Sequence, residues 1–167
     1  KEANSFSKTE LAICLVKKNA MDTILQKATE LGVSKIIPII SERTEVKELN
    51  NERAKKIVIE ATEQSNQLVP PEILDVIKLK DFLKSFDETS KLLFADINSN
   101  ENLKPEDLKN FETLCILIGP EGDFSIKERE IISKMKNIIP ININKNILRS
   151  ETAAISMISI ISYTLLS

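Results

Sequence analysis

Residues 113–130 read TLCILIGPEGDFSIKERE, an apolar run followed by a tight turn and the start of a helix. The apolar run, residues 114–118, shows no alternation, which is typical of a strand buried on both faces of a parallel sheet. Ser125 and Glu128 form an S-x-x-E capping box, so a helix is predicted to begin at Ser125. This strand, turn and helix decide the fold class.

The turn at residues 119–122, Gly-Pro-Glu-Gly, contains two of the three glycines of the chain. Glycine permits a positive φ and a close approach of the backbone to a ligand. Open parallel sheets bind their ligands just beyond the carboxyl ends of the strands. The sequence therefore favours a ligand site at this turn, although an ordinary strand-to-helix connection has the same pattern.

Strand-like and helix-like segments alternate along the rest of the chain, which predicts an α/β domain with a mostly parallel sheet flanked by helices. Further strands are expected at residues 11–16, 35–40, 72–77, 92–95 and 138–143, and helices at 21–31, 54–61, 79–86, near Pro105 and from 153 onward. Pro38 is expected at a sheet edge or a strand end because proline cannot donate to a ladder. Residues 1–10 are polar and linker-like, so the domain is expected to occupy residues 11–167.

The composition fits one domain of 167 residues, with 42% hydrophobic residues and no apolar run as long as a membrane span. There is no histidine, and Cys14 and Cys115 each lie in an apolar run. We therefore expect two buried, reduced thiols in a cytoplasmic protein, with no disulfide and no metal site. The net charge of −2 does not by itself indicate a nucleic-acid-binding protein.

Familiar nucleotide-binding motifs are missing, since neither G-x-G-x-x-G nor a P-loop occurs. Arg149 lies before a predicted helix, where its guanidinium could pair with a carboxylate or hold an oxyanion or a phosphate. Taken alone, Lys27 and Arg43 have the pattern of solvated charges. The residues leave these alternatives open.

Four segments occur together and in order: KATELGV at 27–33, EATEQS at 60–65, IGPEG at 118–122 and ILRSETA at 147–153. The set resembles the ribosomal RNA small subunit methyltransferase E family of the SPOUT superfamily. The resemblance implies a C-terminal deep trefoil knot, S-adenosyl-L-methionine as cofactor, and methylation of uridine N3 in small-subunit (16S) ribosomal RNA or the 30S particle. It also implies a homodimer and an N-terminal PUA-like barrel, which has no counterpart in this sequence.

The resemblance also assigns candidate site residues. Catalytic roles fall on Arg149, Glu121 and Glu151, with the general base left open between the two carboxylates and water. Binding of RNA falls on Lys27, Arg43, Gln64 and Arg149. The cofactor would contact Phe94, Ala95, Ile118, Gly119, Pro120, Glu121, Gly122, Ile143, Asn144, Ile147, Leu148 and Thr152.

Three positions depart from the family pattern: Asp123 and Asn144 stand where glycine is common, and Gln67 stands where arginine is common. Asp and Asn tolerate the left-handed backbone, but Gln67 cannot replace a cation. These departures favour one alternative, a knotted RNA-binding or dimerisation module with weak turnover. A second alternative is a SPOUT enzyme acting on another RNA, such as a tRNA ribose methylase. For the homodimer, the expected interface is an apolar set on the final helix, Ile155, Met157, Ile158, Ile160 and Ile161.

Overall fold

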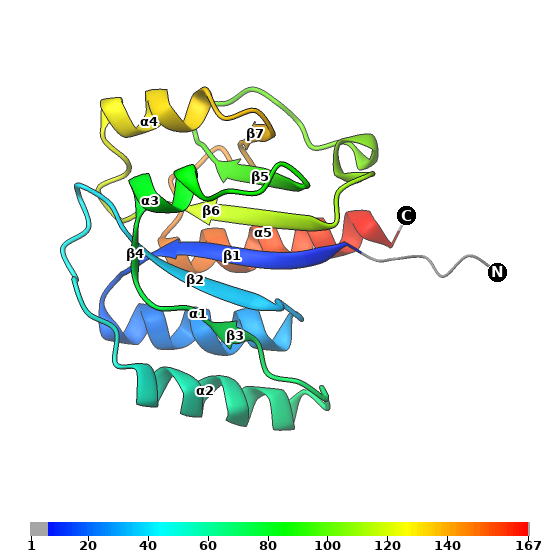
Figure 1. The fold of residues 1–167 in the computed structure, drawn as a ribbon. Helices are drawn as coiled ribbons and strands as arrows, with labels where there is room; N and C mark the ends of the chain where they lie inside the picture. Colours follow the sequence, from blue (N-terminus) through cyan, green and yellow to red (C-terminus); the bar gives the residue numbers. More distant parts are fainter. Residues whose placement is uncertain (1–6, 167) are drawn as a thin grey trace.

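The computed structural model describes residues 7–166, and all seven strands in this range form one parallel sheet (Figure 1). The strand order is β3-β2-β1-β6-β5-β7, and β4 also pairs with β2. The strands are β1 (Lys8–Cys14), β2 (Lys35–Ile40), β3 (Glu72–Ile73), β4 (Ile77–Lys78), β5 (Ser90–Ala95), β6 (Thr113–Ile118) and β7 (Ile138–Ile141). The predicted parallel α/β fold is confirmed.

Helices cover both faces of the sheet: α1, α2 and α5 pack on one face, and α3 and α4 lie on the other (Figure 1). Their bounds are α1 (Lys18–Glu30), α2 (Asn51–Gln64), α3 (Leu79–Lys84), α4 (Ile126–Ser133) and α5 (Ser150–Leu165), with a 3₁₀ turn η1 (Pro105–Leu108). Alternate residues of β1 pack into the core on opposite faces of the sheet. Leu11 and Ile13 pack toward α1 and α5, whereas Ala12 and Cys14 join the cluster beneath α3 and α4.

The first strand begins at Lys8, three residues before the expected start at residue 11, because its first residues pair with Thr113 and Leu114 of β6. Residues 1–6 of the expected linker-like start lie outside the described residues. The final strand ends at Ile141 rather than at residue 143. The predicted trefoil knot stays a prediction.

Pro38 was expected at a sheet edge or a strand end, and this expectation is wrong. It lies in the middle of β2, which has neighbouring strands on both sides. The amide of Leu74 donates to the Ile36 carbonyl, so alternate residues of β2, including Pro38, direct their backbone polar groups toward β3 and β4. The expected strand at residues 72–77 is split into β3 and β4, which pair with β2 on either side of Pro38. The missing amide therefore faces a local gap in the ladder.

Both cysteines are buried and free, as predicted. Burial raises the pKa of the Cys14 thiol from 9.0 to about 12, an effect that hydrogen bonds to Ser41 and Thr44 only partly offset. Burial likewise raises the pKa of Cys115. Such thiols are protonated at neutral pH and serve as packing groups.

The expected dimer surface on α5 needs correction. Met157, Ile158 and Ile161 are buried within this chain, since they belong to the core cluster beneath the sheet. Helix α5 packs against α1, β6 and β1, and these contacts cover most of its apolar face. Of the expected surface, Ile160 and part of Ile155 remain exposed.

Candidate functional site

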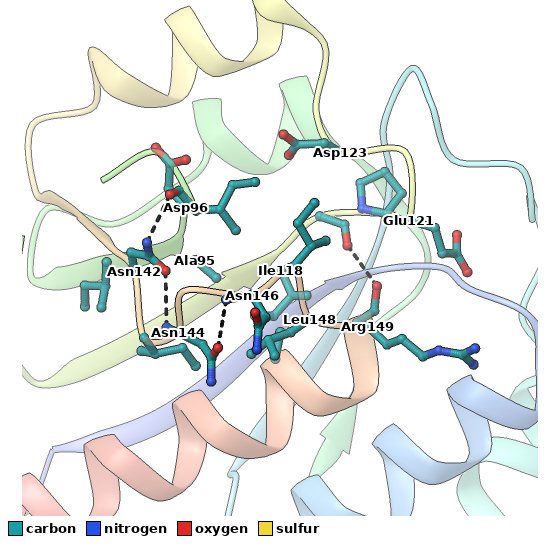
Figure 2. Close-up of a pocket in the computed structure, with 18 of the residues that line it drawn as sticks. Ala95, Asp96, Ile118, Glu121, Asp123, Asn142, Asn144, Asn146, Leu148 and Arg149 are labelled. Carbon is teal, nitrogen blue, oxygen red and sulfur yellow. Dashed lines mark hydrogen bonds between the residues drawn. The ribbon is translucent and has the colours of Figure 1, made fainter. Parts of the chain in front are cut away.

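A crevice of about 420 Å³ opens at the carboxyl ends of β5, β6 and β7 (Figure 2). Three segments form its walls: residues 95–97 after β5, the turn at 118–123 after β6, and the loop from Ile141 to Ser150 that leads into α5. Arg129 of α4 and Ala153 of α5 complete the lining. The volume lies within the range of small-molecule sites, and its position is the one expected for a parallel sheet.

The positive φ in the turn after β6 belongs to Asp123 and not to Gly119 or Gly122. This corrects the expectation that the glycines supply it. Asp123 has a φ of 62°, in the left-handed region, whereas neither Gly119 nor Gly122 has a positive φ. A Cβ on Gly119 would lie 3.0 Å from the Phe124 ring, so tight packing requires this glycine. A Cβ on Gly122 would meet only the Arg43 side chain, at 3.6 Å.

The loop after β7 is held by its asparagines (Figure 2). The Asn142 side chain accepts from the Asn144 amide at 3.2 Å, and the Asn144 side chain accepts from the Asn146 amide at 2.8 Å. The Asn142 side-chain amide donates to the Ile97 carbonyl at 3.0 Å. Because these Asx contacts bend the chain out of the ladder, the strand ends before them. Asn144 itself does not have a positive φ.

Two long-range contacts hold the turn after β6, and one of them joins two of the motif segments. The Ser150 hydroxyl at the start of α5 donates to the Gly119 carbonyl at 3.2 Å. The Arg43 guanidinium donates to the Gly122 carbonyl at 3.0 Å. Glu128 completes the predicted capping box with Ser125, and its second oxygen accepts from the Glu42 amide at 3.1 Å. The turn after β6 is therefore fixed from both sides.

Most of the expected cofactor contacts meet in the crevice, and two of them lie elsewhere. Phe94 is buried beneath the crevice against Phe124, at 5.7 Å between ring centroids, and Thr152 is exposed on α5 outside the lining. The expected residues that do line the crevice are Ala95, Ile118, Gly119, Pro120, Glu121, Gly122, Ile143, Asn144, Ile147 and Leu148.

A second depression, here called the charged hollow, adjoins the crevice at the start of α1. Glu121, Gly122 and Arg149 line both spaces, whereas Glu151 lines only the charged hollow. The charged hollow contains four basic residues, Lys17, Lys18, Arg43 and Arg149, and four acidic residues, Glu42, Glu45, Glu121 and Glu151. This balance offers partners for a polar group and its proton rather than a general attraction for phosphate.

The remaining expected RNA contacts are not near the crevice. Lys27 lies in the last turn of α1, where it pairs with Glu30 at 3.2 Å, and Gln64 is the last residue of α2. Both helices begin near the carboxyl ends of the strands and end near their amino ends, on the side away from the crevice (Figure 1). There the Gln67 side chain donates to the carbonyls of Thr29 and Glu30 and so caps α1.

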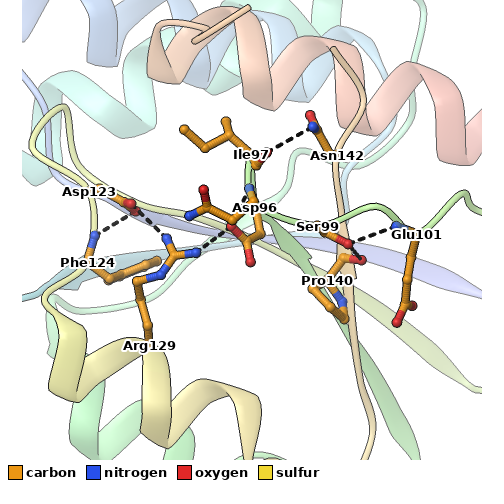
Figure 3. A network of polar contacts seen from close by, with 10 residues as sticks. Asp96, Ile97, Ser99, Glu101, Asp123, Phe124, Arg129, Pro140 and Asn142 are labelled. Atoms are coloured by element: carbon orange, nitrogen blue, oxygen red, sulfur yellow. Dashed lines mark hydrogen bonds and ion pairs between the residues drawn. The ribbon is translucent and has the colours of Figure 1, made fainter. Parts of the chain in front are cut away.

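Sequence reasoning missed a group of charged residues at the crevice (Figure 3). The Arg129 guanidinium pairs with Asp96 at 2.5 Å and with Asp123 at 2.7 Å. Burial lowers the pKa of Arg129, but its two carboxylate partners outweigh burial and raise it, so the guanidinium stays charged. Asp96 could have been found, because it directly follows a predicted strand, where ligands of parallel sheets bind.

Among residues 7–166, no group of three or more histidine, cysteine or carboxylate side chains is arranged to hold a metal ion. In the same part of the chain, no helix combines the length and the apolar character that crossing a bilayer requires.

The fold is that of a parallel α/β domain, with a crevice of the size of a small-molecule site at the strand ends. Residues 2–162 match the family described as RNA methyltransferase domain, and the chain belongs to that family. It is 38% identical over 152 residues to ribosomal RNA small subunit methyltransferase E of Rickettsia conorii, covering 89% of this chain. The resemblance to the ribosomal RNA small subunit methyltransferase E family is thereby confirmed.

Solved structures with a similar fold support this family assignment. A ribosomal RNA small subunit methyltransferase E from Neisseria gonorrhoeae, crystallised with S-adenosyl methionine, superposes with a TM-score of 0.84 at 30% identity, over 94% of this chain and 66% of that one. The TrmH/SpoU tRNA modifying enzyme of Aquifex aeolicus shares only the fold, with a TM-score of 0.54 at 15% identity over 96% of this chain and 74% of that one. The SPOUT-type fold class is confirmed. This chain spans 62% of the Rickettsia relative.

Proposed function

We propose that this chain is the methyltransferase domain of an enzyme that transfers a methyl group from S-adenosylmethionine to uridine N3 in small-subunit ribosomal RNA. The observation that carries the proposal is the shared position of Arg149 and Glu121, which line both the crevice and the charged hollow. A cofactor in the crevice and a nucleobase in the charged hollow would meet across these residues. Ribosomal RNA as substrate also implies action in the cytoplasm.

The lining of the crevice fits an adenosine-containing cofactor. Apolar side chains such as Ile97, Ile118, Ile141 and Leu148 surround it, and the backbone of the two loops supplies polar groups. Apolar walls with a few placed polar groups are typical of small-molecule sites. When bound, S-adenosylmethionine would supply a methyl group on a sulfonium sulfur, which would leave as a neutral thioether.

The chain must favour loss of the N3 proton and align N3 with the methyl group. Deprotonation spreads negative charge over the two carbonyl oxygens that flank N3, and a planar guanidinium is well suited to stabilise it. Within residues 7–166 the Arg149 side chain makes no hydrogen bond or ion pair, so its donors are available to a substrate. The proton would pass to Glu121, Glu151 or water.

Two further features of the family belong to this proposal. An N-terminal PUA-like barrel would supply further RNA contacts, and a second copy of the chain would complete a homodimer. Exposed apolar residues of α5, including Ile160 and Tyr163, would contribute to the dimer. Light scattering that finds only monomers of the complete protein at micromolar concentration would contradict the dimer.

The experiment that tests the function is mass analysis of small-subunit ribosomal RNA from cells with and without the gene. We expect one 3-methyluridine to disappear and to return when the gene is restored. Loss of a methylated ribose from tRNA instead would favour the tRNA ribose methylase alternative. An unchanged RNA, with S-adenosylmethionine still bound by the protein, would favour a module without turnover.

A further inference from the structure

Arg129 connects two neighbouring segments of the crevice lining, which follow the adjacent strands β5 and β6, through one guanidinium group (Figure 3). Its Nη2 atom pairs with Asp96 Oδ1 at the end of β5, and its Nη1 atom pairs with Asp123 Oδ2 in the turn after β6. A planar guanidinium can hold two carboxylates at once in a fixed geometry, which a lysine ammonium cannot reproduce. The spacing of these two segments is thereby tied to one side chain.

Both carboxylates are fixed on their own segments. The Asp123 Oδ1 atom accepts from the Phe124 amide at 2.8 Å, and its backbone amide donates to the Pro120 carbonyl at 2.9 Å. The Asp96 amide donates to the Ile141 carbonyl of β7 at 2.9 Å, and its Oδ1 atom also accepts from the Asn98 amide at 3.0 Å. Arg129 therefore links the ends of β5, β6 and β7.

The wall that contains these ion pairs has open space on both sides. Asp96 and Arg129 line the crevice and also a second cavity of about 370 Å³ beneath α4, whose other lining residues include Phe94, Ile126 and Ile138. The Arg129 guanidinium lies 5.7 Å from the Phe94 ring centroid. Because open space lies on both sides of this wall, we expect the ion pairs to add to the backbone hydrogen bonds that hold it.

The pair with Asp96 is also better shielded than an ordinary surface pair, whereas the Asp123 side chain is 47% exposed. The Arg129 and Asp96 side chains are 22% and 14% exposed, compared with 47% and 25% for the Arg53–Asp22 pair on α2 and α1. Partly buried, multiply bonded ion pairs hold geometry more firmly than exposed ones. The Arg53 pair, remote from the crevice, provides a matched control.

We propose that Arg129 is a positioning residue, which sets the width of the crevice by holding Asp96 and Asp123 in place for the cofactor. The inference rests on the proposed function, because it takes the cofactor to be S-adenosylmethionine. It assigns Arg129 no charge interaction with the sulfonium. Loss of the bridge should therefore weaken S-adenosylmethionine and its uncharged product, S-adenosylhomocysteine, to the same extent.

The test is calorimetric binding of both compounds to the 167-residue chain and to Arg129→Met, Arg129→Lys and Arg53→Met. We expect at least a tenfold loss of affinity for both compounds in Arg129→Met, with their ratio unchanged. Arg129→Lys should fall in between, because an ammonium can serve one carboxylate at a time. Arg53→Met should bind as the unaltered chain does, with a melting temperature close to that of Arg129→Met.

Unchanged affinity in Arg129→Met would overturn the inference and leave the proposed function intact. A shift of the ratio toward S-adenosylmethionine would mean that Arg129 acts through its charge, which also contradicts positioning. Binding of neither compound to the unaltered chain would overturn the proposed cofactor and this inference together. If Arg129→Met fails to fold, Asp123→Gly removes one arm of the bridge at a φ that suits glycine, and unchanged affinity there would overturn the inference.

Discussion

The surroundings of Arg149 indicate a role in the reaction and not in holding the fold. It occupies the N-cap position of α5, but its side chain makes no capping hydrogen bond, and no ion pair joins it to Glu151 within residues 7–166. The side chain is exposed where the crevice and the charged hollow meet. A guanidinium without a structural partner at such a place is available to a reacting group.

Replacing Arg149 with lysine should therefore slow methyl transfer without harming the protein. The charge is kept and the planar fork is lost, which typically costs about 3 kcal/mol, or roughly 100-fold in rate, when one transition-state donor is removed. Cofactor affinity and melting temperature should remain as in the unaltered protein. Single-turnover methylation of 30S particles by the complete protein, beside a thermal melt, measures both. A normal rate per folded molecule with a large loss of stability would make Arg149 structural.

The two glycines after β6 should respond differently to substitution. Gly122→Val places a branched side chain between the crevice and the charged hollow, where the added Cβ meets only Arg43, so cofactor binding should fall about 100-fold while the fold survives. Gly119→Ala should instead destabilise the domain, by roughly 1–3 kcal/mol, because its Cβ crowds Phe124. Calorimetry and urea unfolding compare the two variants. Unchanged cofactor affinity in Gly122→Val would show that the crevice is not the cofactor site.

Helix α4 is held at its start by one carboxylate that accepts hydrogen bonds from two backbone amides. The buried Glu128 accepts from the Ser125 amide at 3.0 Å and from the Glu42 amide at 3.1 Å, so it joins the helix start to the segment after β2. Ser125 serves one donor, the Glu128 amide. The two residues of the capping box thus have unequal structural roles.

Glu128→Ala should accordingly cost more stability than Ser125→Ala. Loss of an N-cap hydroxyl typically costs about 1 kcal/mol, whereas Glu128→Ala leaves two amides without an acceptor, at roughly 1–3 kcal/mol each. Urea unfolding of the two variants gives the comparison directly. Equal losses would indicate that the contact between Glu128 and Glu42 adds nothing to stability.

Elements of this chain were predictable where local patterns determine them. The run at residues 114–118 and the Ser125 capping box became β6 and α4, since an unbroken apolar run and a cap act through neighbours in the sequence. Pro38 was misplaced because the gap that accommodates it lies in strands 35 residues or so farther along the chain. The buried face of α5 was misjudged because apolar content does not reveal which neighbour covers a helix.

The candidate site was predictable in the same uneven way. The family motifs located the turn after β6 and the loop before α5, which line the crevice. The ion pairs of Arg129 were out of reach, because they join residues separated by 6 and 33 positions and depend on how the strand ends meet. Asp123 tolerates its positive φ as the sequence suggested, and Asn144 proved not to need one.

At the scale of the whole molecule, buried cysteines on the central strands make stability sensitive to alkaline pH. The pKa of Cys14 is raised from 9.0 to about 12, so between these values the unfolded chain loses the thiol proton and the folded chain keeps it. The stabilisation is complete below pH 9 and is lost as pH rises toward 12. At pH 10.5 the loss should reach about 2 kcal/mol.

Urea unfolding at pH 8 and pH 10.5 tests this dependence, with Cys14→Ala as the control. The fall in stability between the two pH values should be smaller in Cys14→Ala, because alanine has no proton to lose. Other alkaline titrations are common to both proteins and cancel. An equal fall would contradict the role of Cys14.

For the whole molecule we propose that the crevice holds S-adenosylmethionine so that a uridine in the charged hollow is methylated at N3. The most direct measurement supplies the complete protein with methyl-labelled S-adenosylmethionine and 30S particles from cells lacking the gene, and then digests the RNA for mass analysis. We predict that the label appears in one 3-methyluridine of the small-subunit RNA, and that Arg149→Lys reduces it. Label in a ribose, in another base, or in no nucleotide despite cofactor binding would contradict the claim.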